Sequence, residues 1–168
     1  LPDRVVHIRS FSKAYGPDLR LAAVGGSGPV IEAMVHRRQL GPAWSSRLLQ
    51  GVLLQLLTTR ATADTVAEAA ATYAARRSSL INSLRAHGVT VPGKSGINLW
   101  LEVGDETNAL IALSAQGIGA APGSPFMVSS GTVPHLRLTV ATVGTGFDEL
   151  AGALAEAASI PPGRRVGA

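Results

Sequence analysis

The hydrophobic period of the chain changes near residue 90, and this change limits the folds open to its second half. From about Thr65 to His87 apolar side chains recur at helical spacing, which predicts a long amphipathic helix. Thr65 and Glu68 have the spacing of a capping box at the start of this helix, and Gly88 is expected to end it. From Ile97 to Val103 apolar residues instead alternate with polar ones, which is typical of a half-buried strand. The second half therefore mixes helices with strands.

The remaining segments extend the same mixed pattern along the chain. We expect strands at Arg4–Ile8, Leu19–Val24, Ile118–Pro122 and His135–Val140, and helices at Val30–Arg38, Ala43–Leu57, Asp105–Gln116 and Phe147–Ala158. This order predicts an α/β protein whose second half is an α+β layer with mainly antiparallel strands. The first half has the character of a piece of a larger domain.

Composition excludes several classes of site. Among the 168 residues 46% are apolar and none is cysteine, so a sizeable core is possible and disulfides, thiolate catalysis and cysteine metal sites are excluded. No metal site of another kind is predicted. No apolar run is long enough to span a membrane, and a cytoplasmic protein is the default expectation. Short basic clusters favour solvated faces over nucleic-acid binding; these are His36–Arg38, Arg76–Arg77 and Arg164–Arg165.

A lysine turn carries the most specific chemistry. The chain has thirteen arginines and only two lysines, and Lys13 follows Ser10 and Ser12 in a polar turn after the first strand. Only a primary amine condenses with an aldehyde, which a guanidinium cannot do. The two serine hydroxyls, backbone amides and the guanidinium of Arg20 together suit a phosphate dianion. Taken without further information, Lys13 also fits a solvated surface lysine, and that alternative stays open.

The stretch Ser10-Phe11-Ser12-Lys13, with Arg20 seven residues after the lysine, resembles the cofactor-lysine motif of class I and II aminotransferases. These are fold-type I proteins that use pyridoxal 5'-phosphate (PLP). The resemblance implies that Lys13 forms the Schiff base with PLP and that Ser10 and Arg20 bind its phosphate. Ser12 is a second candidate for the phosphate, or supports the turn. The family often has glycine where this chain has Ala22.

A second match lies far downstream. The stretch from Pro134 to Thr139 resembles the family strand whose arginine binds the α-carboxylate of the substrate, which implies this role for Arg137. Arg137 alternates with the apolar residues on either side of it and is therefore expected on the other face of the strand. The stretch from Ser95 to Trp100 resembles the family's small-domain strand that begins near a glycine and carries an aromatic residue. Asn98 is a candidate substrate contact there, and Trp100 is interpreted first as packing and second as a wall of the site.

The resemblance covers the chain from Val5 to about Ala158 and implies a domain division. Residues 1–60 would be a remnant of the large PLP-binding domain, and residues 61–168 the C-terminal small domain with its linking helix. The family's acidic partner of the pyridine nitrogen, its ring-stacking aromatic and its glycine-rich phosphate loop would precede this stretch. We therefore expect the chain alone to bind PLP weakly at best and not to turn over. The family also implies a homodimer.

Two functions remain open for the whole protein. Residues 11–22 and 38–50 resemble the aminotransferase-like domain of MocR-type regulators in the GntR family more than ordinary transaminases. In that interpretation the chain senses PLP and an amino acid or related small molecule, and DNA is bound only by a winged-helix domain outside it. The alternative is a PLP-dependent aminotransferase acting on an amino acid and a 2-oxo acid, with Lys13 also moving the α-proton. Sequence upstream of the chain would separate the two.

Overall fold

The structure, a computed structural model, describes residues 2–41, 43–129 and 133–161. It divides into an N-terminal unit of residues 1–69 and a C-terminal unit of residues 70–168. Helix α3 (Arg60–Ala86) begins in the first unit and ends in the second. The assignment of residues 1–60 and 61–168 to two named domains stays a prediction. Within the described part of the chain, every helix is too short or too polar to cross a membrane.

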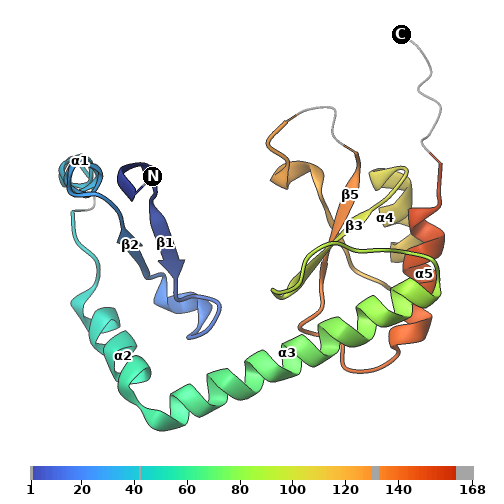
Figure 1. Cartoon of the computed structure of the whole chain (residues 1–168), viewed down its shortest axis with the longest axis horizontal. Coiled ribbons are helices and arrows are strands. Elements are labelled where there is room, and N and C mark those ends of the chain that lie inside the picture. Colours follow the sequence, from blue (N-terminus) through green and yellow to red (C-terminus); the bar gives the residue numbers. More distant parts are fainter. Residues whose placement is uncertain (1, 42, 130–132, 162–168) are drawn as a thin grey trace. The chain divides into compact units, whose positions relative to one another are not determined.

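A two-stranded ribbon and two helices make up the N-terminal unit (Figure 1). Strands β1 (His7–Ser10) and β2 (Ala22–Gly25) are antiparallel, with Ser10 opposite Ala22. Two short 3₁₀ turns, η1 (Pro2–Arg4) and η2 (Pro17–Leu19), and the helices α1 (Gly28–Gln39) and α2 (Arg47–Thr58) complete it. The expected strands Arg4–Ile8 and Leu19–Val24 thus begin later than predicted, because 3₁₀ turns take their first residues.

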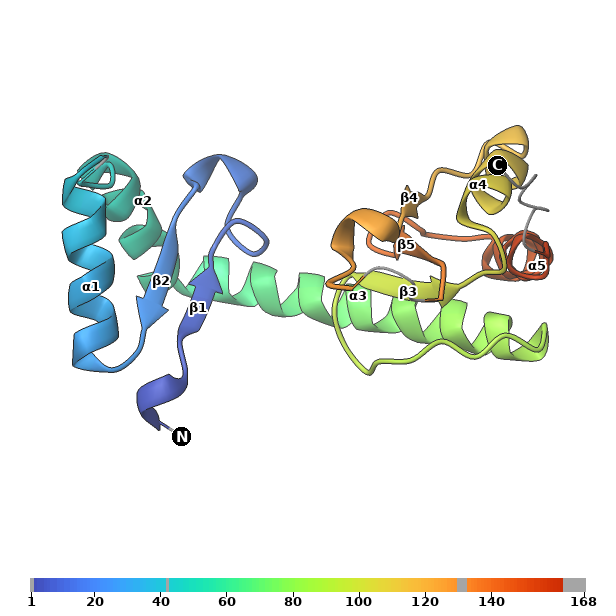
Figure 2. The same ribbon diagram turned by 90° about the horizontal axis from the view of Figure 1, so that it is seen from above.

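A three-stranded antiparallel sheet forms the centre of the C-terminal unit. Its order is β3-β5-β4, with β3 at Asn98–Glu102, β4 at Ala121–Pro122 and β5 at His135–Thr139. Helices α4 (Glu106–Ala115) and α5 (Phe147–Ala158) lie side by side next to this sheet (Figure 2), and η3 (Ser124–Phe126) follows β4. The predicted mixture of helices and antiparallel strands is confirmed.

One face of the sheet is buried against the helices. The alternation that predicted the strands places four leucines on this face, all at most 6% exposed: Leu99, Leu101, Leu136 and Leu138. They form one cluster with leucines of α3, α4 and α5, namely Leu80, Leu84, Leu113 and Leu154. Each buried leucine contributes about 2 kcal/mol through the apolar surface removed from water. The core therefore fixes the sheet, and the opposite face carries the polar residues of β3 and β5.

The start of the long helix was predicted wrongly. Helix α3 begins at Arg60, and the Thr65 hydroxyl donates to the Ala61 carbonyl within the helix rather than capping it. Arg60 instead pairs with Asp64 one turn later, at 3.1 Å. A Thr-x-x-Glu spacing also occurs inside helices, so the spacing alone does not define a start. The expected cap of α4 is confirmed, because Asp105 accepts the Asn108 amide at 2.8 Å.

Candidate functional site

The predicted cofactor residues lie on and around one closed loop of the N-terminal unit. Residues 11–21 connect β1 to β2, and the Phe11 amide donates to the Leu21 carbonyl at 3.0 Å, which closes the loop at its base. Inside the loop the Tyr15 amide donates to the Phe11 carbonyl at 2.9 Å. Leu19 is buried and anchors the second half of the loop. These two hydrogen bonds and the buried leucine fix the conformation of the loop.

The pairing of the strands brings Ser10, Ser12 and Arg20 to the base of this loop. Ser10 lies opposite Ala22, and continuing the same register places Ser12 opposite Arg20. The Ser12 amide approaches the Ser10 hydroxyl at 3.4 Å. Hydroxyls, a backbone amide and a guanidinium at one end of a hairpin are groups that bind a phosphate.

Arg20 has an unusual backbone conformation. Its φ of 47° and ψ of 32° put it in the left-handed region, and it is the one non-glycine residue of the described chain with a positive φ. This conformation costs about 1 kcal/mol for a residue with a Cβ, and such residues concentrate at functional sites. Arg20 is the residue that follows η2 and leads into β2.

Lys13 lies in the first turn of the loop and its side chain is exposed. Within the part of the chain that the structure describes, its amine has no hydrogen bond or ion pair, although Asp18 lies on the same loop. The amine is therefore accessible to an aldehyde. Ser10 ends β1, and Ser12, Lys13 and Arg20 lie on the loop that follows it, so the four residues belong to one hairpin.

Arg137 lies at the centre of the polar sheet face in the C-terminal unit. It pairs with Trp100 of β3 on one side and with Ala121 of β4 on the other. Its guanidinium carbon is 4.5 Å from the centre of the Phe126 ring. The Nε atom is buried and has no hydrogen-bond partner among the described residues. Because Arg137 is only half-buried, the exposed part of its guanidinium can still bind an anion.

Three rings surround this arginine. Trp100 stacks on His135 at 5.2 Å between ring centres, and it meets Phe126 edge to face at 6.5 Å. Trp100 was expected to act first in packing, and it packs against the rings of Phe126 and His135. Neither of these two residues was predicted as part of a site. His135 could have been predicted, because it lies two residues before Arg137 on the same strand face, whereas Phe126 lies in a separate segment.

Asn98 lies on the same sheet face as Trp100 and Arg137, because these positions alternate with the buried leucines. Its side-chain oxygen accepts the hydroxyl of Thr139 at 3.0 Å. Asn98 is half-buried. Asn98 and Arg137 are therefore brought together on one surface, whereas the lysine loop belongs to the other unit.

Glu106 is a further site residue that the sequence analysis missed. Its carboxylate accepts the amides of Gly123 and Ser124, each at 2.8 Å, and the Ser124 hydroxyl at 2.7 Å. Burial and the neighbouring Asp105 raise the pKa of this carboxyl, but the three hydrogen bonds outweigh them and the pKa lies below its ordinary value. Glu106 thus holds the turn that carries Phe126.

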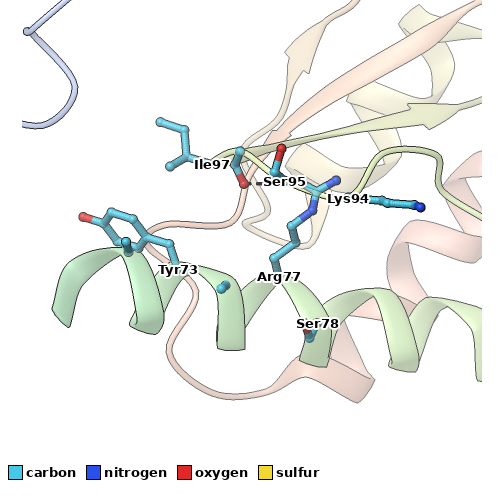
Figure 3. Close-up of a pocket in the computed structure, with 9 residues that line it drawn as sticks. Tyr73, Arg77, Ser78, Lys94, Ser95 and Ile97 are labelled. Atoms are coloured by element: carbon cyan, nitrogen blue, oxygen red, sulfur yellow. Dashed lines mark hydrogen bonds between the residues drawn. The ribbon is translucent and has the colours of Figure 1, made fainter. Parts of the chain in front are cut away.

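A hollow beside α3 has a structural rather than a ligand-binding explanation. It is lined by the α3 side chains of Tyr73 and Arg77 and by the loop before β3 (Figure 3). Arg77 is 5% exposed and donates to the carbonyls of Asn98 at 2.7 Å and Gly93 at 3.1 Å. The expectation of a solvated Arg76–Arg77 pair is therefore wrong for Arg77. Its guanidinium fastens the segment that leads into β3.

No cluster of three histidine, aspartate or glutamate residues that could hold a metal ion occurs among the residues that the structure describes. The N-terminal unit carries the lysine loop, and the C-terminal unit carries Arg137, Asn98 and the rings beside them. The roles of these residues in binding stay predictions.

Two curated proteins are similar to this chain in sequence. The vitamin B6 salvage pathway transcriptional repressor PtsJ of Salmonella typhimurium is 32% identical over 137 residues, which cover 81% of this chain and 32% of PtsJ. The HTH-type transcriptional regulator TauR of Rhodobacter capsulatus is 28% identical over 129 residues, or 73% of this chain and 27% of TauR. The chain therefore spans about a third of the length of these curated relatives.

Solved structures agree on the fold. LysN, an alpha-aminoadipate aminotransferase from Thermus thermophilus solved with N-(5'-phosphopyridoxyl)-L-leucine, matches 91% of this chain and 41% of its own, with a TM-score of 0.76 and 22% identity. The model of the family "Aminotransferase class I and II" matches residues 2–154. This chain belongs to the class I and II aminotransferase family.

Proposed function

We propose that the chain is the cofactor-sensing and effector-sensing part of a MocR-type transcription regulator, with PLP bound at Lys13. The observation that carries this proposal is the closed loop of residues 11–21, which bears an unpaired amine and the groups that suit a phosphate. The two curated relatives, both regulators of transcription by name, support the choice of a regulator.

Each residue of the loop has a separate task in this proposal. When bound, PLP supplies an aldehyde and an electron-withdrawing ring. Lys13 would hold the cofactor through its primary amine, which can condense with the aldehyde with loss of water. Arg20 presents a planar fork to the phosphate, and the hydroxyls of Ser10 and Ser12 donate to further phosphate oxygens. The left-handed backbone at Arg20 sets the direction in which its side chain leaves the loop.

Arg137 and Asn98 would bind the second ligand, an amino acid or a related small molecule. The guanidinium of Arg137 pairs with the ligand carboxylate through two parallel hydrogen bonds. The Nε atom is buried, so the exposed part of this half-buried guanidinium would supply the donors. The Asn98 oxygen is already engaged by Thr139, so its amide nitrogen is the group available to the ligand.

The partners of the whole protein belong to the same proposal. We place it in the cytoplasm as a homodimer, with DNA bound by a domain outside this chain. Binding of the small molecule would then change the arrangement of the DNA-binding parts.

The phosphate half of the proposal can be tested with PLP and pyridoxal, which differ only in the phosphate. The chain is incubated with each aldehyde, reduced with borohydride and digested, and the label on the Lys13 peptide is measured. Pyridoxal closes to an internal hemiacetal that lowers its free aldehyde, so the ratio of PLP label to pyridoxal label is compared between Lys13 and Lys94, which is also exposed. This ratio should be several times higher on Lys13, and Arg20→Gln should bring the two ratios together. Arg47→Gln, at an exposed arginine of the same unit, is the matched control. Equal ratios on the two lysines of the wild type would contradict a phosphate site in this loop.

A PLP-dependent aminotransferase is the second candidate, supported by the family to which the chain belongs. The same Lys13 and Arg137 would serve, with Lys13 moving a proton from the α-carbon of an amino acid. Amino-group transfer between L-leucine and 2-oxoglutarate in the presence of PLP distinguishes the two. We expect no turnover by the chain, and multiple turnovers that require Lys13 would favour the enzyme.

A further inference from the structure

The turn after β4 is fastened to the first residue of α4. Glu106 accepts three hydrogen bonds from Gly123 and Ser124, at 2.7–2.8 Å. The Gly123 amide also lies 2.8 Å from the His135 carbonyl of β5, so the same turn is fixed from two sides. A carboxylate that accepts three donors is a strong anchor, because hydrogen bonds to an ionised group are about twice as strong as neutral ones.

The anchored turn carries one exposed aromatic side chain onto the arginine. Phe126 is 53% exposed, so apolar burial does not hold its ring in place. Its ring nevertheless lies 4.5 Å from the guanidinium carbon of Arg137 and meets Trp100 edge to face. Something other than a core must therefore fix Phe126, and the three hydrogen bonds to Glu106 are the observed restraint on its turn.

We propose that Glu106 is a positioning residue for the carboxylate grip of Arg137, acting through the turn Gly123–Phe126. This rests on the proposed function, in which Arg137 binds the ligand carboxylate. The Phe126 ring, 4.5 Å from the guanidinium carbon, restricts the motion of this side chain and would favour approach of a carboxylate along the edge of the guanidinium. That is the direction in which two parallel hydrogen bonds form. Glu106 does not touch the ligand.

The effect on ligand affinity depends on how far the Arg137 side chain is already ordered before the ligand binds. A guanidinium that rotates freely loses rotamer entropy when it grips a carboxylate, whereas one held against a ring has already lost part of it. A cation–π contact at a half-exposed site contributes enough to change a dissociation constant about fivefold. Removing the anchor should therefore weaken carboxylate binding about fivefold, without abolishing it.

The arrangement of Arg137 can be measured directly by NMR. In the ¹⁵N-labelled full chain, the Nε–H resonance of Arg137 is assigned as the signal that Arg137→Lys removes. The ring current of Phe126 shifts this resonance, so its position depends on how the ring lies against the guanidinium. Glu106→Gln should move this resonance in the same direction as Phe126→Leu. In a Phe126→Leu background Glu106→Gln should cause no further shift, because the two act in series. Glu149→Gln is the matched control, since Glu149 is also an acid in the first turn of a helix.

Ser124→Ala removes only the hydroxyl contact to Glu106 and covers the case in which Glu106→Gln does not fold. It should produce a smaller shift in the same direction. An Arg137 resonance that stays at its wild-type position in a folded Glu106→Gln or Ser124→Ala chain would overturn the proposal. So would equal, additive shifts in the Phe126→Leu background.

Ligand binding is then followed on the same resonance with L-leucine, and with L-leucinamide as the probe that lacks the carboxylate. The dissociation constant for L-leucine should rise about fivefold in Glu106→Gln. An unchanged constant would overturn the positioning role. If the wild-type Arg137 resonance shifts equally with the two probes, the carboxylate role of Arg137 in the proposed function is contradicted instead. The positioning of Arg137 by Glu106 is tested separately, by the resonance shifts without ligand.

Discussion

Replacing Arg77 by methionine should destabilise the C-terminal unit more than any other single arginine change on α3. Methionine keeps the apolar stem but removes the guanidinium that binds the segment before β3. Arg77 is 5% exposed and donates to the carbonyls of Asn98 at 2.7 Å, Gly93 at 3.1 Å and Gly96 at 3.4 Å. Methionine would leave these acceptors without a donor.

The size of the loss follows from which acceptors can return to water. A hydrogen bond from a charged group contributes about 1.5–3 kcal/mol. The bond to Asn98 counts in full, because this residue is half-buried at the start of β3. The bond to Gly93 counts about half, since Gly93 is exposed, and the long contact to Gly96 is neglected. The expected loss is about 2–4 kcal/mol, which moves a urea midpoint by roughly 1–2 M.

The assay must report the C-terminal unit alone. The chain has two tryptophans, Trp44 and Trp100, and Trp44 is 82% exposed in the other unit. In a Trp44→Phe background the fluorescence of Trp100 follows the unfolding of the sheet in urea. Arg85→Met is the matched control, because Arg85 is exposed on the same helix and bonds only to the side chain of Asn82 among the described residues.

The reasoning would be refuted if the midpoint of Arg77→Met lay within the experimental error of that of Arg85→Met. Arg77→Lys provides a graded point, because an ammonium reaches fewer of the carbonyls and should lose roughly half as much as methionine.

Three further changes test separate features of the C-terminal unit. Because the pKa of Glu106 is lowered in the folded state, its contribution to stability is present above the ordinary pKa of 4.5 and is lost as the pH falls through the folded pKa. The urea midpoint of Glu106→Gln should therefore depend less on pH below 4.5 than the midpoint of the wild type does. Parallel curves of midpoint against pH would contradict this. Asp105→Ala removes the cap of α4 and should cost about 1 kcal/mol in the same titration, whereas a loss under about 0.3 kcal/mol would argue against the cap. Gly123→Ala places a Cβ 2.4 Å from the His135 carbonyl and should destabilise the unit by about 1–3 kcal/mol, while Gly119→Ala, with open space around it, should change the midpoint little; similar midpoints would speak against the close approach.

The sequence could predict those features that depend on neighbours along the chain. The alternation around Leu99 and Leu136 defined two strands and their buried face, and Asp105 identified the start of α4. Lys13 and Arg20 stood out because a motif spacing of seven residues lies within one loop. Each of these is a local pattern, with its partner a few residues away.

The features that the sequence could not predict depend on contacts across the fold. Glu106 meets Ser124 from 18 residues away, and Arg77 meets Asn98 from 21 residues away. Arg77 even lies on the stripe of α3 that turns inward, where a basic pair suggested a solvated face. Thr65 was misinterpreted for a different reason, because it has the local spacing of a capping residue but lies inside the helix. The long-range contacts of Glu106 and Arg77 produce no periodic pattern in the sequence.

The central claim is that Lys13 is the residue that bonds to PLP, and the chain contains its own control. It has two lysines, and Lys94 is also exposed. The full chain is treated with limiting PLP, reduced with borohydride and mapped by peptide mass spectrometry. We predict that the phosphopyridoxyl label on Lys13 greatly exceeds that on Lys94, even where total labelling is low, and that Lys13→Arg does not transfer it to Lys94. Equal labelling of the two lysines, or a label mainly on Lys94, would contradict the account.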